Sequence, residues 1–346
     1  MTDAREIGTA VRTLLSGAVD GSLDDAGFDR SVWDRLEDSG FAGVGVPESA
    51  GGSGGGPDDL VEVLFEVGRA GLSLPIVQHT VLAGWALAAA CAQLPTGVLT
   101  FARASDGLMA AQGPSGLVVE GRLARVPWAD DATHLVVIAD LLGERRLIVL
   151  ERDQYTVEPG HDLAGQSRDE VLIDGAIVVA ADCLPAPASL TDDAIERRAA
   201  WATAAMIAGA LDRISALTTR YVTEREQFGR PLMKFQAVQR HVVLVAELAA
   251  QVAAAVRGAA GDDGAPFAMA ASKIVANELG SQAAASAHQA HGAIGMTREY
   301  ELGRLTRRIW AWRDEHGTTR HWSRWLGASA LAAGDAGAWS LLTNQH

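Results

Sequence analysis

The spacing of hydrophobic positions changes twice along the chain. Up to about residue 95, apolar side chains such as Trp33 and Leu36 recur at the spacing of an amphipathic helix. The glycine-rich run 51–57 interrupts this pattern, because a helix does not tolerate so many glycines. Asp58 or Asp59 can then cap a second helix, which we expect over residues 60–70. The first region is therefore predicted to be helical.

Residues 97 to about 185 have a different texture, with short runs rich in β-branched side chains. These runs are 117–119, 135–138, 147–150, 171–173 and 177–179. Turn residues separate them, among them Gly143, Pro159-Gly160 and Asp174-Gly175. Short apolar runs with turn residues between them predict a small all-β unit, either a barrel or a sandwich.

Helical periodicity returns after residue 190. The long, alanine-rich helices are expected over 192–222, 235–258 and 267–292, with a break at 261–266. Long helices joined by short breaks are typical of an antiparallel four-helix bundle. The chain is therefore predicted to be a multi-domain α+β protein. Its domains would be helical over 1–95, β over 96–188 and a helical bundle over 189–346.

Composition narrows the class of protein. The chain is 48% hydrophobic with a formal net charge of −14, which indicates a globular protein and argues against nucleic acid as a partner. Cys91 and Cys183 have no metal-ligand spacing and are expected to be buried thiols in a reducing cytoplasm. The longest apolar run, 81–92, is too short for a bilayer, so no membrane span is expected. Lys234 and Lys273 are the only lysines in the chain.

The first group of residues with chemical potential surrounds the join between two predicted helices, at Arg225-Glu226-Gln227-Phe228-Gly229. The Arg225 guanidinium suits a pyrophosphate, Gln227 and Gln236 add amide hydrogen bonds, and Phe228 offers a face for stacking. The alternative is a helix end that Gly229 caps, with surface charges around it.

Two further groups lie nearer the C-terminus. Gln289-Ala290-His291-Gly292 places small residues at a helix end, where a backbone can approach a phosphate, although such a glycine is often only a cap. The segment 310–318 brings together the carboxylate of Glu315, the imidazole of His316 and the hydroxyl of Thr318. Its alternative reading is a charged helix end followed by Gly317.

Taken together, these segments resemble the acyl-CoA dehydrogenase family over nearly the whole chain. Val46-Pro47-Glu48-Ser49-Ala50-Gly51-Gly52 is similar to that family's V-P-E-x-x-G-G segment. Residues 225–229 match its R-x-Q-F-G element, and Gln289 to Gly292 match the start of its Q-x-x-G-G segment. An ungapped register then places Gly317-Thr318 at the family's E-G-T.

The resemblance implies an FAD-dependent dehydrogenase that oxidises an acyl-CoA thioester and passes electrons to an acceptor such as an electron-transfer flavoprotein. In this family the β domain of one subunit holds the flavin ring, while the neighbour's bundle holds adenosine and pyrophosphate. FAD-binding roles are implied for Arg225, Gln227, Phe228, Gln236, Gln289, His291 and Gly292, with Thr318 near the flavin. A base removes the α-proton of the thioester.

This chain departs from the family pattern near the flavin ring. Residues 100–106 lack the Glu-Pro of the family's T-E-P-x-x-G-S-D loop. Arg125 and Pro127 stand where the family has the Trp and Thr that flank the flavin, and Trp128 follows three residues after the Trp position. Proline has neither a hydroxyl nor an N–H group, so it cannot make the usual contact to flavin N5.

The catalytic base also departs from the pattern. His316 occupies the usual glutamate position and Glu315 precedes it, so these two are the candidate catalytic residues. Some relatives place a glutamate on the first bundle helix instead, where this chain has Ala199, with Glu196 one turn away.

Retained adenosine-side motifs beside altered ring-side motifs favour one subunit of a hetero-oligomeric acyl-CoA dehydrogenase. The alternatives are a homo-oligomer that uses Glu315 or His316, a scaffold subunit without flavin, and a flavin monooxygenase on the same fold.

Overall fold

The computed structural model describes residues 4–17, 27–104, 107–261, 265–297 and 300–343. The chain forms two compact units. The helical unit contains Met1–Asp24, Pro57–Leu72 and Glu196–His346, and the β unit contains Asp25–Gly56 and Ser73–Ile195. The N-terminal helices are thus shared between the two units. The three predicted domain boundaries stay predictions.

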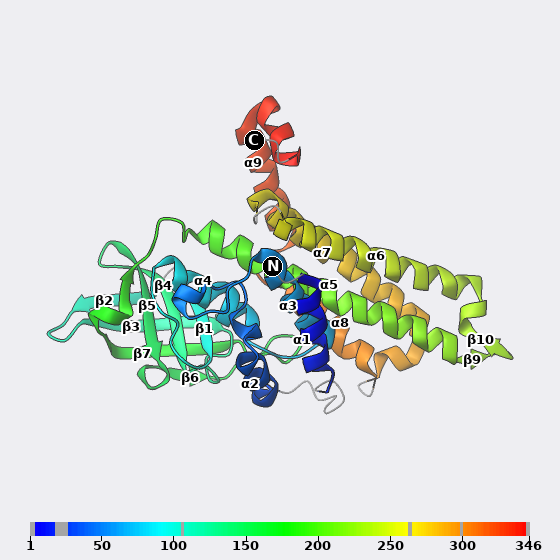
Figure 1. The fold of residues 1–346 in the computed structure, drawn as a ribbon, viewed down its shortest axis with the longest axis horizontal. Coiled ribbons are helices and arrows are strands. Elements are labelled where there is room, and N and C mark those ends of the chain that lie inside the picture. Colours follow the sequence, from blue (N-terminus) through cyan, green and yellow to red (C-terminus); the bar gives the residue numbers. More distant parts are fainter. Residues whose placement is uncertain (1–3, 18–26, 105–106, 262–264, 298–299, 344–346) are drawn as a thin grey trace. The chain divides into compact units, whose positions relative to one another are not determined.

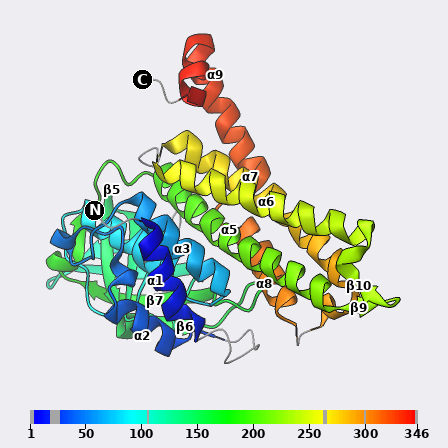
Figure 2. The same cartoon turned by 45° about the vertical axis from the view of Figure 1, so that its right-hand side comes forward.

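The helical unit is built from long helices. They are α1 (Ala4–Ser16), α3 (Pro57–Ala70), α5 (Asp192–Glu224), α6 (Gln236–Gly261), α7 (Pro266–His291), α8 (Glu301–Asp314) and α9 (Thr319–Thr343). Of these, α6 and α7 lie side by side in both views (Figures 1 and 2). Short elements join the helices: β9 (Glu226–Gln227), β10 (Arg230–Pro231), η6 (Leu232–Lys234) and η7 (Gly292–Met296). The predicted helical bundle is confirmed. The helix α3 begins at Pro57, and proline suits this position because the N–H group it lacks would be unpaired in the first helical turn.

Glycines set how closely α3 packs on α5. A Cβ atom added to Gly209 would lie 1.8 Å from the Phe65 carbonyl oxygen. One added to Gly68 would lie 2.2 Å from the Met206 carbonyl oxygen. The two helix backbones are therefore in contact, and any larger side chain at either glycine would push them apart.

The β unit contains two four-stranded sheets, with strand orders β1-β4-β5-β8 and β2-β3-β7-β6. The strands are β1 (Leu99–Ala104), β2 (Leu108–Gln112), β3 (Leu117–Val126), β4 (His134–Leu141), β5 (Glu144–Glu151), β6 (Thr156–Glu158), β7 (Asp169–Val178) and β8 (Cys183–Pro185). Side chains of both sheets share one core, which includes Leu135 and Val137 from β4 and Val171 and Ile173 from β7. The predicted all-β unit is thus a sandwich.

One predicted turn in this unit is wrong. Asp174-Gly175 lies inside the continuous strand β7 and does not separate two strands. Val119 pairs with Ala176 and Gly121 pairs with Ile173, so Asp174 and Gly175 together oppose one residue of β3. Gly175 has a φ of 68°, which is the left-handed conformation that a β-bulge requires.

Apart from the short η4 (Arg152–Gln154) and η5 (Ala180–Asp182), the described helices that lie wholly in the β unit precede its first strand. They are α2 (Arg30–Asp38), η1 (Phe41–Gly43), η2 (Glu48–Ala50), the π-helix η3 (Val77–Gly84) and α4 (Trp85–Ala89). Just after α4, Cys91 has a φ of 56° and is exposed, and Cys183 is only half-buried, so the expectation that both cysteines are buried is wrong. The position of Cys91 in the chain reversal after the helix turns the thiol outward.

The described helices include one with the composition of a membrane span. α6 has 26 residues and an apolar window, of which 33% is buried within the fold. A single helix of this kind is weak evidence, because the core helices of bundles have the same composition. The expected absence of a membrane span stays a prediction.

A buried histidine makes the β unit sensitive to acid. The Nδ1 atom of His79 accepts a hydrogen bond from the Leu99 N–H group at 3.0 Å, and its ring packs edge-on against Trp33. Burial lowers the pKa of His79 to about 4. The unfolded chain protonates this imidazole at a higher pH than the folded chain does. Stability is therefore lost as pH falls from about 6.5 to about 4, by on the order of 3 kcal/mol.

We expect His79→Gln to reduce this acid-induced loss, because the amide oxygen can accept the Leu99 N–H bond without titrating. The measurement is the free energy of unfolding in urea, compared at neutral pH and near pH 4. His161→Gln serves as the control, since His161 is exposed in the same unit. An equal loss in His79→Gln and the unaltered protein would contradict the assignment.

Candidate functional site

A β-hairpin at the end of α5 carries the first group of predicted site residues. Gln227 of β9 pairs with Arg230 of β10, and Phe228 and Gly229 form the two-residue turn between them. Both turn residues have positive φ values, 54° and 76°, as a type I′ turn requires. The alternative in which Gly229 merely caps α5 is therefore excluded.

The hairpin presents its side chains to solvent. Phe228 is 90% exposed, and its ring lies edge-on to Phe235 with 6.0 Å between centroids. The Arg230 guanidinium lies 4.2 Å from the Phe235 ring centroid. Arg225, Gln227 and Gln236 are likewise exposed. So large an exposed aromatic ring among polar groups is typical of a binding surface.

The second predicted group meets the first at the same end of the bundle. His291, the last residue of α7, stacks on Tyr221 of α5 with 4.7 Å between ring centroids, one turn before Arg225. Tyr300 lies 5.1 Å from the same imidazole. Gln289 is exposed, and Gly292 ends α7 with a φ of 65°. The aromatic stack thus joins the hairpin to the end of α7, and we call this region the hairpin end.

Burial at the hairpin end favours the neutral form of His291. Its Nδ1 atom lies 2.8 Å from the Ala287 carbonyl oxygen, to which it donates, and burial lowers its pKa. The Nε2 atom is buried and has no hydrogen-bond partner among the described residues. This nitrogen is therefore an acceptor without a donor, as expected in a site that another molecule completes.

The third predicted group lies where α8 joins α9. Glu315 follows the last helical residue, and His316 adopts a left-handed φ of 51°. The Trp322 indole Nε1 donates to the His316 carbonyl oxygen at 2.8 Å. A Cβ atom on Gly317 would lie 2.4 Å from that Nε1, so only glycine fits there. Glu315 and His316 are half-buried, and Thr318 is exposed.

Other titratable groups lie at this end of the bundle. The Glu196 carboxylate of α5 lies 3.6 Å from the Nε2 atom of His321. Ala199, at the position where some relatives carry a glutamate, is 1% exposed. We call this region, with the segment 315–318, the carboxylate end.

The structure does not bring the hairpin end and the carboxylate end together. Tyr300 precedes α8 at the hairpin end, and Glu315 follows it at the carboxylate end. A helix of this length separates them by about 20 Å. Residues 225–236 and 289–292 therefore form one group, and Glu315, His316 and Thr318 form another.

Residues 125–128 include the positions where the family has its flavin-flanking Trp and Thr, and we call them the ring-side segment. This segment packs against the rest of the β unit. Trp128 is 2% exposed and lies 6.1 Å from the Phe28 ring, so it presents no face to a ligand. The Thr100 hydroxyl donates to the Pro127 carbonyl oxygen. Arg125 is exposed with a φ of 56°. Residues 105–106 of the shortened loop lie outside the described residues.

A single carboxylate holds this segment in place. Asp169 Oδ2 accepts from the Ser167 hydroxyl at 2.6 Å and from the Ala129 N–H at 3.0 Å. The Ser167 Oγ in turn accepts from the Trp128 N–H at 2.9 Å. Asp169 Oδ1 accepts from the Gly160 N–H at 3.1 Å. These bonds fix the backbone around Trp128 from the neighbouring strand β7 of the same sheet, where Asp169 pairs with Val126.

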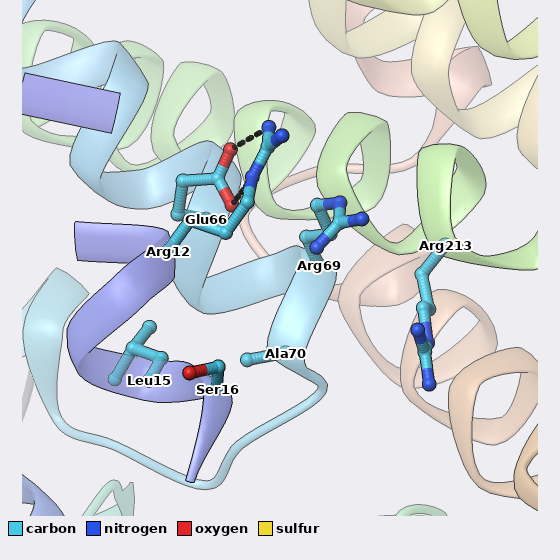
Figure 3. A pocket seen from close by; sticks show the side chains of 7 residues that line it. All are labelled: Arg12, Leu15, Ser16, Glu66, Arg69, Ala70 and Arg213. Atoms are coloured by element: carbon cyan, nitrogen blue, oxygen red, sulfur yellow. Dashed lines mark hydrogen bonds and ion pairs between the residues drawn. The ribbon is translucent and has the colours of Figure 1, made fainter. Parts of the chain in front are cut away.

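A cavity of about 150 Å³ in the helical unit is a structural ion-pair cluster (Figure 3). Its lining residues are Arg12, Leu15, Ser16, Glu66, Arg69, Ala70 and Arg213. Each arginine is paired with a carboxylate: Arg12 with Glu66 at 2.6 Å, Arg69 with Asp212 at 2.7 Å, and Arg213 with Glu301 at 2.7 Å. The guanidinium charges are therefore neutralised, and the cavity does not attract an anionic ligand.

Several residues of these regions have no local sequence signal. Tyr221 and Tyr300 enclose His291 from other elements, and Asp169 acts on residues about forty positions earlier. His321 follows directly after the recognised motif and could have been included with it. The others require knowledge of which segments meet.

The two parts of an FAD molecule fit this chain differently. The hairpin end offers the guanidinium groups of Arg225 and Arg230, side-chain amides and an exposed ring, which suit a pyrophosphate and an adenosine. The ring-side segment offers neither the hydroxyl nor the N–H that the family uses. Among the described residues, the hairpin end thus suits the adenosine half of FAD, while Pro127 has neither the hydroxyl nor the N–H expected at its position.

Comparison with known proteins agrees with the motifs. Residues 2–93 match the family described as acyl-CoA dehydrogenase, N-terminal domain, and residues 197–321 match acyl-CoA dehydrogenase, C-terminal domain. Acyl-CoA dehydrogenase IpdE2 of Mycobacterium tuberculosis is 31% identical over 283 residues, which cover 80% of each protein.

Two solved structures are similar over most of the chain. One is the ChsE4-ChsE5 complex from Mycobacterium tuberculosis, with a TM-score of 0.81, 24% identity, and coverage of 96% of this chain and 98% of that one. The other is the Tcur3481-Tcur3483 steroid ACAD, with a TM-score of 0.79, 26% identity, and coverage of 96% and 99%. The chain therefore belongs to the acyl-CoA dehydrogenase family of FAD-dependent oxidoreductases that act on acyl-CoA.

Proposed function

We propose that this chain is the FAD-grasping subunit of a hetero-oligomeric acyl-CoA dehydrogenase, which oxidises the α,β-bond of an acyl-CoA thioester. The observation that carries the proposal is the contrast between the exposed hairpin end and the closed ring-side segment. The partner would be a homologous subunit with an intact ring-side segment. Its β domain would seat the flavin ring.

The hairpin end supports this division because its polar groups point away from its own fold. Arg225, Gln227 and Gln236 are exposed beside a ring that is 90% exposed. A guanidinium can bind a pyrophosphate through two parallel hydrogen bonds, and Phe228 can stack on a base. In our proposal these residues hold the adenosine half of a flavin that is seated mainly on the partner.

The ring-side segment supports the same division. Trp128 is buried, and the carboxylate of Asp169 binds the backbone around it, so a shift of the segment toward a ligand would break several hydrogen bonds at once. Pro127 can donate no hydrogen bond. The chain's own β unit therefore lacks the usual means of holding a flavin ring.

The hairpin end and the carboxylate end lie about 20 Å apart, so our proposal gives them different roles. In our proposal the hairpin end serves the partner's flavin, and the carboxylate end does not take part in holding that flavin's adenosine half. The similar ChsE4-ChsE5 structure is described as a complex of two named chains, which supports a hetero-oligomeric arrangement.

When bound, FAD accepts the β-hydride of the thioester. The residues of this chain position the cofactor: Arg225 neutralises pyrophosphate charge, and the amides of Gln227, Gln236 and Gln289 orient it. His291 offers an acceptor nitrogen and Gly292 leaves room for close approach of the ligand. The complex would reduce an electron-transfer flavoprotein in the cytoplasm.

The first test is the flavin content of the chain purified without a homologue. We expect far less than one FAD per chain by absorbance, because the ring-side contacts are missing. Co-expression with an acyl-CoA dehydrogenase-like partner that has an intact ring-side segment should restore flavin. A content near one FAD per chain in the chain by itself would overturn the proposal.

A second prediction concerns Arg225. In the complex, Arg225→Ala should weaken FAD binding by roughly tenfold or more, since a charge-assisted hydrogen bond contributes about 1.5–3 kcal/mol. The measurement is the dissociation constant of FAD. Arg230→Ala is the matched control, because it removes the same charge from the same hairpin. An unchanged constant in Arg225→Ala would make Arg225 an ordinary surface cation.

A third prediction concerns the base. We expect Glu315→Gln, His316→Asn and Glu196→Gln to lower turnover of the complex by less than tenfold, because the partner supplies the base. A correctly placed base contributes about 10²–10⁴-fold. Fatty acyl and steroid CoA thioesters should both be assayed, given the similar steroid ACAD. A loss of 10² or more from any of the three, with FAD content and assembly unchanged, would assign the base to this chain.

A further inference from the structure

Lys273 is a buried cationic residue that no motif explains. It lies on α7 with a relative exposure of 0%, between α5 and α8, which run beside α7 (Figure 2). Among the described residues its Nζ atom donates to two acceptors. One is the Trp312 carbonyl oxygen at 2.5 Å, and the other is the Thr203 hydroxyl at 3.2 Å.

The hydrogen bond from Lys273 to Trp312 lies at the end of a helix. Trp312 lies in the last turn of α8, where the final four carbonyl groups have no partner within the helix. An N–H donor at this end also complements the negative end of the helix dipole. Lys273 therefore caps α8 from inside the bundle, three residues before Glu315.

The segment 315–318 is held from two sides. Lys273 binds the helix end that precedes it, and the Trp322 indole of α9 binds the His316 carbonyl oxygen. Between these two contacts, His316 and Gly317 both have positive φ values, 51° and 94°. A left-handed histidine persists only where surrounding contacts determine the backbone.

Packing needs do not explain a lysine at this site. Burial lowers the pKa of Lys273 to about 7, while Asp314 acts to raise it and Arg313 to lower it. A methionine would fill a similar space without the cost of removing an amine from water. Lys273 has an N–H donor for each of the two acceptors. The side chain is thus suited to hydrogen bonding at the end of α8.

We infer that Lys273 is a positioning residue for the segment 315–318, because its capping contact fixes where α8 ends and so where Glu315, His316 and Thr318 stand. In the proposed function the partner supplies the base, so the role of Lys273 goes beyond that proposal and lies in how this chain builds the segment 315–318. The contact itself can be tested without flavin.

The test is hydrogen exchange of backbone amides in the full chain. We expect Lys273→Met to speed exchange of the amides over 313–319 by about tenfold, while the amides over 225–235 keep their rates. Asn277→Leu is the matched control. Asn277 lies one turn further along α7, is 2% exposed, and has no side-chain hydrogen bond among the described residues. Its substitution should leave exchange over 313–319 unchanged.

Two further variants separate positioning from general stability. Lys273→Gln retains two N–H donors without charge and should restore slow exchange in large part. Thr203→Val leaves the Trp312 contact in place and should have a smaller effect than Lys273→Met, and this variant keeps the test available if Lys273→Met does not fold. Equal acceleration at both ends of the bundle, or none over 313–319, would overturn the inference. Flavin content of the complex tests the proposed function independently.

Discussion

The rigid length of α5 is the constraint on which the rest of the helical unit depends. Thr203 of α5 lies beside the C-terminal end of α8, and Tyr221 lies beside its N-terminal end. Between these positions α5 rises about 27 Å, so the carboxylate end and the hairpin end are held apart. The glycine contacts with α3 keep the helix in place at its middle. The two groups of candidate residues therefore occupy separate positions on one chain.

The β unit shows how local hydrogen bonding can close a site. The Asp169 carboxylate accepts hydrogen bonds from backbone N–H groups that follow Trp128, so these groups have partners without any ligand. The hairpin end has the opposite character, because its Phe228 ring and its side-chain amides are exposed. The capacity to bind a ligand thus depends on which polar groups the fold leaves without hydrogen-bond partners.

Buried cations have a common role in the helical unit, which is to cap helix ends. Arg304 donates to the Gly71 carbonyl oxygen at 3.2 Å and Arg308 to that of Leu72 at 3.4 Å, just beyond the end of α3. Lys273 does the same for α8. A buried charge is costly unless it is hydrogen-bonded, and carbonyl groups at helix ends supply acceptors with a favourable dipole.

The sequence by itself determined the bundle, the β unit and the family, because periodicity and the motif from Arg225 to Gly229 are local patterns. It could not determine that Asp174-Gly175 is a bulge, since the same dipeptide makes turns, and only pairing with β3 decides between them. The burial of Trp128, the stack of Tyr221 on His291 and the cap from Lys273 to Trp312 were decided by tertiary structure. Each joins segments far apart in sequence, and neither member of such a pair carries a local signal for the other.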